Sequence, residues 1–374
     1  MQNIVVILYH VSALSNWILR LLPYMKDVNI HIIHFSKLQK QKMPIVVDVN
    51  FYDVSYFSYR SMRSLIKNIN PNKVLFFTFR SVLDFTMYKL CIELGIKKVY
   101  LEHGLFSADS IRFRLNLAKK NPWETAKRQL MHIYKYLGYA LNSNKFFNEL
   151  KEFGDFYRHG KIGLIQFDRY YLYSQRSVDC YSEIFDNIPN NYTIVGYPIF
   201  SDENEKANAI SFKNTKNEGV VYVHQPLIYD GIASISYEEE KLYLINMAKL
   251  LSPVYGTFTI LLHPRDNLRE YLKMFENEDV AIVQSPNDFK VFVDKKIVIG
   301  HYSTALLYGL YFKKITVIID YPSVEPNEIF KEIFPHFSAP DELLKSEVLM
   351  SKKLSNYMLG NVNTYENIAI CINS

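Results

Sequence analysis

Cysteine is scarce in this chain, and long apolar runs are absent from it. The 374 residues include only three cysteines, Cys91, Cys180 and Cys371, too far apart for a metal site and typical of a reducing compartment. No stretch approaches the roughly 18 consecutive apolar residues of a transmembrane helix. The apolar run at residues 4–9 has no positive residue before it, unlike a secretory signal. These absences favour a cytoplasmic protein.

A strong charge excess is also missing. The formal net charge is +5, which is too weak and too dispersed to indicate a nucleic-acid partner. It is compatible with an anionic substrate or a membrane surface. Hydrophobic residues make up 49% of the chain, enough for a large core. The length suits two domains of roughly 150–200 residues better than one.

Short apolar runs alternate with helical patterns through the first half. The spacing predicts a helix over 83–94, which Gly95 ends. Alternation of this kind indicates βαβ units and a parallel sheet. The predicted strands are residues 4–9, 30–35, 74–79 and 99–101.

The second half repeats the same rhythm after a polar boundary. Residues 201–218 are the most polar stretch and show no apolar periodicity, so we interpret them as a linker. This divides the chain into domains 1–200 and 219–374. We expect an α/β protein with a GT-B-like architecture, in which two Rossmann-like domains face each other across a cleft. The predicted elements here are strands 220–223, 257–262, 281–283, 296–299 and 315–319, and helices over 237–251 and from Thr304.

Polar residues follow three of these strands, at the sheet edge where open α/β sheets usually bind ligands. His263 precedes a proline, which holds it in an extended conformation, and its imidazole could donate to a leaving phosphate. Thr304 begins a predicted helix, whose free amides suit an anion. Each pattern alone has an ordinary alternative, a satisfied loop histidine or a helix N-cap. The three loops are Glu102-His103-Gly104, His263-Pro264-Arg265 and His301 with Ser303 and Thr304.

The ordered set of motifs resembles bacterial sialyltransferases of the lipooligosaccharide and polysialic acid capsule type. The motifs of that family are an acidic pair before glycine, then His-Pro, then a Ser-Ser or Ser-Thr pair. This chain shows "LEHGLFS", "LLHPRD" and "GHYSTALL" in that order. The segments "VYVHQPL" and "SYEEEKLYL" look like the part leading to the nucleotide-binding half of the family.

The resemblance implies a role for individual residues. Glu102 would be the general base, with Gly104 letting the backbone turn closely beneath it, and we expect Glu102 to be exposed. His263 would bind and protonate the CMP phosphate. His103 replaces the second acid of the family, and Asp230, which also precedes a glycine, is a rival base. The implied substrate-binding positions are Gly104, His103, Gln225, Pro264, Arg265, Asp288, His301, Ser303 and Thr304.

The implied reaction is an inverting, metal-independent transfer of sialic acid, or a related nonulosonic acid, from its CMP donor to a hydroxyl of a cell-surface glycan. No cofactor or metal is expected, and no Asp-x-Asp pair occurs. Alternatives are a transferase using CMP-Kdo, CMP-pseudaminate, CMP-legionaminate or CDP-glycerol, and a non-catalytic subunit of a polysaccharide assembly complex. The sequence leaves a homodimer open.

Residues 111–136 form a basic segment with apolar residues interspersed. It holds seven Lys or Arg residues and one acid, Glu124. One interpretation is a solvated helix pair broken at Pro122. The other is a basic amphipathic surface that lies on anionic lipid at the inner face of the cytoplasmic membrane or grips an anionic acceptor.

Overall fold

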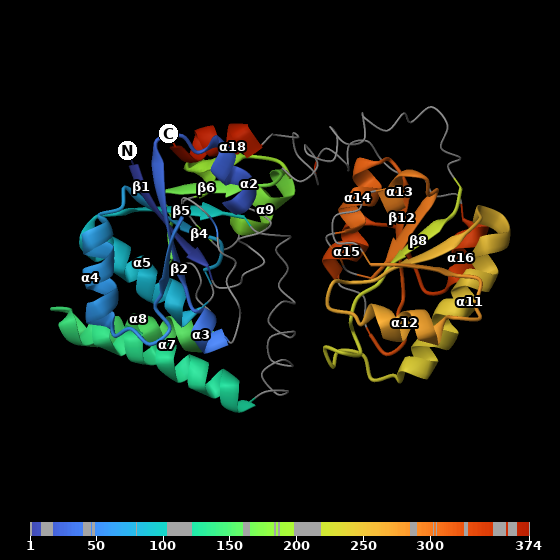
Figure 1. Cartoon of the computed structure of the whole chain (residues 1–374), viewed down its shortest axis with the longest axis horizontal. Helices are drawn as coiled ribbons and strands as arrows, with labels where there is room; N and C mark the ends of the chain where they lie inside the picture. The colour runs from blue at the N-terminus through green and yellow to red at the C-terminus, as the bar shows by residue number, and fades with distance from the viewer. Residues whose placement is uncertain are drawn as a thin grey trace. The chain divides into compact units, whose positions relative to one another are not determined.

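The computed structural model describes two α/β units (Figure 1). The described residues are 2–8, 18–39, 46, 49–79, 81–102, 122–159, 165–182, 185, 188–197, 218–284, 290–301, 303, 305–324, 328–346, 357 and 365–373.

The first unit is built on a seven-stranded parallel sheet. Its strand order is β3-β2-β1-β4-β5-β6-β7, the order of a doubly wound nucleotide-binding fold with one extra strand. Buried aliphatic residues dominate the central strands, as expected for a sheet covered on both faces. The strands are β1 (Gln2–Leu8), β2 (Val28–His34), β3 (Val49–Asp53), β4 (Lys73–Phe76), β5 (Lys97–Leu101), β6 (Arg169–Leu172) and β7 (Tyr192–Ile194).

Local sequence signals set the helix ends of this unit. Ser81 and Asp84 form a reciprocal capping box at the start of α5, and Gly95 ends that helix with a φ of 67°. The predicted helix and its glycine stop are therefore confirmed. The helical segments are α2 (Leu19–Leu21), η2 (Leu22–Tyr24), α3 (Ser36–Gln39), α4 (Tyr59–Ile69), α5 (Val82–Leu94), α7 (Pro122–Asn142), α8 (Phe146–His159), α9 (Gln175–Ser182) and η4 (Ile188–Asn190).

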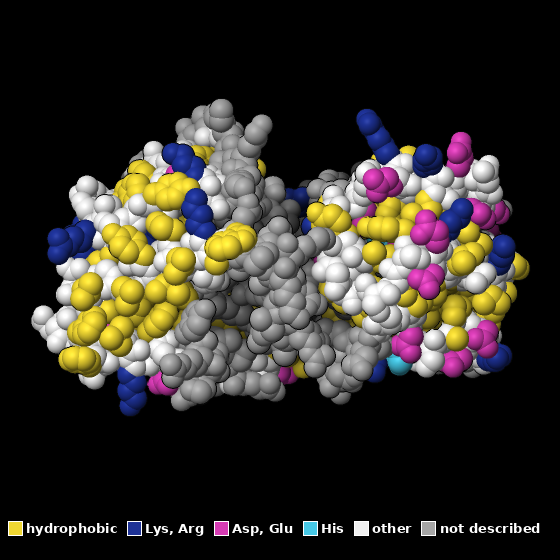
Figure 2. Space-filling view, turned by 90° about the horizontal axis from the view of Figure 1, so that it is seen from below, with side chains coloured by type: hydrophobic (Ala, Val, Ile, Leu, Met, Phe, Trp, Pro, Cys, Tyr) yellow, Lys and Arg dark blue, Asp and Glu magenta, His cyan; other side chains and the backbone are white. Residues whose placement is uncertain are grey.

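Helix α7 has a buried face and an exposed apolar face. It begins at Pro122, the residue that the sequence marks as a helix break, and packs on α5 through buried Tyr136 and Tyr139. Figure 2 shows apolar side chains gathered on the part of the molecule that carries α7 and α8. The exposed members are Trp123, Leu130, Tyr134, Leu137 and Leu141, with Phe147 at the start of α8.

The last helix, α18 (Tyr365–Asn373), belongs to the first unit. Lys73 Nζ donates a hydrogen bond to the carbonyl of Ile372, and Tyr171 donates to the carbonyl of Cys371. The Arg20 guanidinium lies over the ring of Tyr365. The sequence placed residues 219–374 in one domain, and this part of the prediction is wrong. The apolar face of α18 is covered by the first unit.

The second unit has a six-stranded parallel sheet of order β10-β9-β8-β11-β12-β13, which repeats the doubly wound pattern. The strands are β8 (Val220–Val223), β9 (Phe258–Leu261), β10 (Ala281–Val283), β11 (Ile297–Gly300), β12 (Ile315–Ile319) and β13 (His336–Phe337). The helices are α11 (Tyr237–Tyr255), α12 (Leu268–Met274), α13 (Lys290–Val293), α14 (Leu306–Tyr311), α15 (Glu328–Ile333) and α16 (Pro340–Lys345). The predicted linker, apart from Glu218, lies outside the described residues.

Gly309 marks the close approach of α14 to the sheet. A methyl group built on Gly309 would collide with Thr316 Oγ1 and would lie 3.0 Å from Val298 Cγ2. Only glycine therefore lets α14 pack on β11 and β12 at this distance.

We expect Gly309→Ala to destabilise the protein by about 1–3 kcal/mol, because the sheet and helix must separate. Gly154→Ala in α8 is the matched control. A methyl group there meets nothing within 4 Å, so this variant should be neutral or up to about 1 kcal/mol more stable. Urea unfolding of both variants measures the difference. Equal stability of the two would contradict the packing argument.

Candidate functional site

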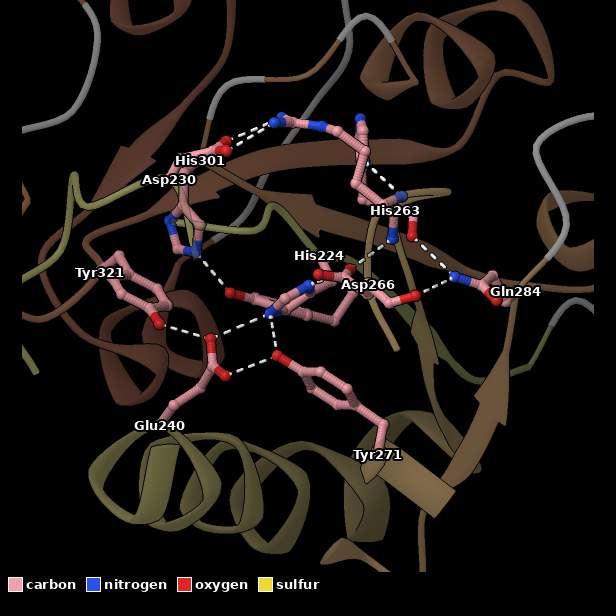
Figure 3. Close-up of polar contacts among 11 residues, drawn as sticks. His224, Asp230, Glu240, His263, Asp266, Tyr271, Gln284, His301 and Tyr321 are labelled. Carbon is pink, nitrogen blue, oxygen red and sulfur yellow. Dashed lines mark hydrogen bonds and ion pairs between the residues drawn. The ribbon is translucent and has the colours of Figure 1, made fainter. Parts of the chain in front are cut away.

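Three histidines lie at the carboxyl ends of neighbouring strands in the second unit (Figure 3). His224 follows β8, His263 follows β9 and His301 follows β11. The strand order reverses between β8 and β11, which is where doubly wound sheets bind their ligands.

His224 is held between two carboxylates. Its Nδ1 lies 2.7 Å from Asp266 Oδ2 and its Nε2 lies 2.9 Å from Glu240 Oε1. Glu240 also accepts hydrogen bonds from the hydroxyls of Tyr271 at 2.7 Å and Tyr321 at 2.5 Å. Because both ring nitrogens face acceptors, the ring is a buried imidazolium, only 1% exposed.

Burial alone would lower the pKa of His224. The hydrogen bonds to Asp266 and Glu240 and their negative charges outweigh that effect and raise the pKa of His224 to about 9. The pKa of Glu240 is lowered, because the contacts with His224 and the two tyrosines outweigh the opposing effect of burial. The cluster is therefore charged at neutral pH.

Sequence reasoning missed this cluster. The signal was present, since "VYVHQPL" places His224 directly after a strand, as in the other two loops. The segment "SYEEEKLYL" is the start of α11, where Ser236 and Glu239 form a capping box. The next residue, Glu240, then points into the core, and no pattern in the sequence identifies which of three consecutive glutamates does so.

The turn that carries His263 is fixed by Asp266. The His263 amide donates to Asp266 Oδ2 at 2.7 Å, and the Asp266 amide donates back to the His263 carbonyl at 2.9 Å. The Arg265 amide donates to His263 Nδ1 at 3.1 Å, so the neutral ring carries its proton on Nε2. Gln284 Nε2 donates to the carbonyls of His263 and Asp266.

The half-buried ring of His263 is neutral in the free protein. Burial, and then the nearby Arg265 cation, lower its pKa below the ordinary value. Its Nε2–H is therefore a hydrogen-bond donor. A bound phosphate would raise the pKa again and favour proton donation.

Asp230 and Arg265 form a two-pronged ion pair. Arg265 Nη1 and Nη2 donate to the two Asp230 oxygens at 2.5 Å and 2.7 Å, and the Asp230 side chain is buried. Both oxygens of Asp230 are occupied, so the predicted action as an alternative base would require this ion pair to open.

His301 is a core residue. Its Nδ1 donates to the Ile319 carbonyl at 2.6 Å, and its Nε2 accepts from Tyr222 at 2.5 Å. Burial lowers the pKa of His301 to about 4, so the ring is neutral. With both nitrogens used and the ring buried, His301 joins β8, β11 and β12 and offers no group to a substrate.

Ser303 does not cap the helix that follows it. Its Oγ accepts from the Ala305 amide at 3.2 Å, and α14 begins at Leu306 with no side-chain cap. The prediction of a helix from Thr304 is therefore wrong by two residues. Gln225 is half-buried and Pro264 is exposed. Four predicted positions, His103, Gly104, Asp288 and Thr304, lie outside the described residues.

Glu102 lies in the first unit, directly after β5, and is fully buried. Its Oε2 accepts from the Tyr173 amide at 2.6 Å and its Oε1 from Ser177 Oγ at 3.0 Å. Burial raises the pKa of Glu102 to about 8, against these hydrogen bonds. The predicted exposure is wrong, because this carboxyl group joins β5 to the start of α9. The base role of Glu102 stays a prediction.

Neither a metal cluster nor a membrane-spanning helix is found in the parts of the chain that the structure describes. No three His, Cys, Asp or Glu side chains there are arranged to hold a metal ion. No helix there combines the length and the apolar character needed to cross a bilayer.

Comparison with solved structures shows the fold. The chain is similar to the UDP-GlcNAc 2-epimerase of Methanocaldococcus jannaschii, with 13% identity, a TM-score of 0.52 and coverage of 100% of this chain and 99% of the other. It is also similar to a UDP-N-acetylglucosamine 2-epimerase, described as putative, from Listeria monocytogenes, with 11% identity, a TM-score of 0.51 and coverage of 99% and 94%. The fold is GT-B.

At such low identity, the GT-B likeness carries no activity to this chain. The two structures named are epimerases, so they do not support the resemblance to sialyltransferases. No protein-family description matches the sequence. No curated protein matches it significantly.

The His224 cluster predicts a pH dependence. The raised pKa of His224 contributes stability that is complete below about pH 6.5 and is lost as the pH rises to about 9. The loss should be on the order of 3 kcal/mol. Chemical unfolding at a series of pH values measures it, and His224→Gln should lack this part of the profile.

NMR of histidine-labelled protein gives an independent measurement. One imidazole should remain protonated at about pH 8 and should disappear from the spectrum of His224→Gln. If every ring is neutral at that pH, the ion-paired description of His224 fails.

Proposed function

We propose that this protein is a nucleotide-sugar-dependent glycosyltransferase that binds the donor phosphate at His263. The observation that carries the proposal is the His263 turn. It presents an Nε2–H donor at the carboxyl edge of the second sheet, and Asp266 fixes its backbone from a buried ionic cluster.

The chemistry follows from that donor. The bond between the anomeric carbon of the sugar and the donor phosphate breaks, and the phosphate oxygen gains negative charge. The Nε2–H of His263 stabilises that charge and can transfer its proton to the oxygen. An acceptor hydroxyl forms the new bond to carbon and gives its proton to a base. Glu102 is the candidate base, and for this role it must first lose its own proton and become accessible to the acceptor.

The proposed donor is a CMP-linked sialic or related nonulosonic acid, and the acceptor is a cell-surface glycan. The ordered motifs around Glu102, His263 and Ser303 support this choice, and a single donor phosphate suits a site built on one histidine turn. The named epimerases act on UDP-GlcNAc, which makes a UDP-sugar enzyme the second candidate.

Calorimetry with CMP and UDP tests the donor. The protein should bind CMP more tightly than UDP, and His263→Ala should weaken binding by about tenfold or more, because a hydrogen bond to a charged group is lost. His263→Gln, which keeps an N–H group, should bind with intermediate affinity. UDP preference would assign the protein to the UDP-sugar enzymes, and unaltered nucleotide binding in both variants would reject His263 as the phosphate ligand.

The exposed face of α7 supports a second part of the proposal, which is that the enzyme binds an anionic membrane surface. Its apolar residues recur at helical spacing on one side, and Trp123 is 86% exposed. Lys127 lies exposed beside them, whereas Lys135 of the same basic segment is buried and donates to the Ser55 carbonyl. Apolar insertion combined with positive charge is the combination that binds anionic lipid surfaces.

Vesicle sedimentation tests this surface. The double variant Leu130→Gln/Leu141→Gln should bind phosphatidylglycerol vesicles about tenfold more weakly, because two exposed leucine side chains can then no longer insert into the lipid. Leu242→Gln/Leu250→Gln, two exposed leucines of α11, is the matched control and should bind as wild type does. Wild-type binding by both variants would refute the membrane surface. A wild-type dimer that only the α7 variant loses, with no vesicle binding, would assign α7 to a second copy of the chain.

A further inference from the structure

Arg176, the second residue of α9, is a buried cation without a bonded partner. Its side chain is only 4% exposed, and its Nη1 is fully buried and makes no hydrogen bond. Among the described residues, no carboxylate approaches its guanidinium within ion-pair distance. Proteins rarely bury an arginine in this way, because the desolvation of the charge is then uncompensated.

The nearest acidic group does not balance this charge. The Arg176 cation acts on Glu102 through space, but the two oxygens of Glu102 already accept from Tyr173 and Ser177. Burial raises the pKa of Glu102 to about 8, so the carboxyl group is mostly protonated at neutral pH. The guanidinium therefore keeps a net positive charge within a buried region.

The location of Arg176 suits a ligand. Glu102 directly follows β5, Ser174 is the second residue after β6, and Val195 directly follows β7. These three strands are neighbours in the first sheet, and Glu102 is bonded to Tyr173 and Ser177 at the start of α9. This is the edge at which doubly wound sheets bind ligands. The hydroxyls of Ser174 and Ser177 lie 3.4 Å apart in the same turn as Arg176.

We propose that Arg176 binds an anionic group, a carboxylate or a phosphate, on the molecule that accepts the sugar. The guanidinium has parallel N–H donors that match either group, and a bound anion would compensate the charge that the fold leaves unpaired. The identification of the ligand as the acceptor rests on the proposed function. The anion site itself rests on Arg176 alone.

The variant Arg176→Met tests whether the Arg176 cation binds a ligand or stabilises the fold. Methionine is apolar and has a comparable length, so removing an unpaired buried cation should leave the melting temperature unchanged or raise it. Arg60→Met is the control, because it removes the same charge from an exposed position of α4. A lower melting temperature for Arg176→Met than for Arg60→Met would indicate a structural charge and overturn the proposal.

Binding is measured by calorimetry with N-acetylneuraminate as the carboxylate probe and glycerol phosphate as the phosphate probe. The wild type and Arg60→Met should bind one of the probes, and the preferred probe identifies the source of the anion. The affinity of Arg176→Met for the preferred probe should be lower by about tenfold or more, because a charge-assisted contact is lost. Arg176→Lys keeps the charge without the planar guanidinium, so its affinity for the probe should lie between those of the wild type and Arg176→Met. It replaces Arg176→Met in the test if the methionine variant does not fold. Equal binding by all four proteins, or no binding of either probe to the wild type, would refute the site.

CMP and UDP binding, measured on the same samples, keeps this test apart from the proposed function. Arg176→Met should bind nucleotide as wild type does, because His263 lies in the other unit. Anion binding that depends on Arg176 in a protein that binds no nucleotide would retain the anion site and reject the glycosyltransferase.

Discussion

The pairing of His224 with Asp266 and Glu240 is the interaction on which the second unit depends. It joins three elements that are far apart in the sequence: the end of β8, the turn after β9 and the first turn of α11. Removing either carboxylate would leave a buried cation short of a partner, which is far more costly than never burying it. The cluster therefore fixes the carboxyl edge of the sheet before any ligand arrives.

The position of His263 depends on the buried contact between His224 and Asp266. Asp266 uses one oxygen for both the ring of His224 and the amide of His263, so the imidazolium and the turn share a single carboxylate. The ion pair between Asp230 and Arg265 supports the same turn from its other side. His263 is thus held by neighbours that do not themselves need to touch a substrate.

The sequence predicted the elements whose position follows from the periodicity of apolar residues. It did not predict the direction in which individual side chains point. Alternating apolar runs predicted most of the central strands and the α/β class, because buried parallel strands leave a continuous apolar signal. The strands β3, β6 and β13 were missed: β3 and β13 lie at sheet edges, and β6 and β13 have only four and two residues. Glu102 and His301 were expected to face a ligand, yet both face the core. A residue at the end of a strand can point either way, and only tertiary packing decides which.

The three histidines that follow β8, β9 and β11 have different roles, and only two of them, His263 and His301, were predicted as site residues. One histidine became a buried ion, one a neutral core residue and one a half-buried donor. Their sequence contexts are nearly alike. The difference lies in what surrounds each ring: two carboxylates for His224, a carbonyl and a tyrosine for His301, and a backbone amide for His263.

The packing of α18 on the first unit affects the order in which the protein can be completed on the ribosome. The first sheet is synthesised early, but the surface around Lys73 and Tyr171 stays uncovered until residues 365–373 emerge. The second unit is contiguous through most of its length and can fold before that happens. The unit that is begun first is therefore the one that is finished last, and translation that stops before α18 leaves its apolar docking surface open to other chains.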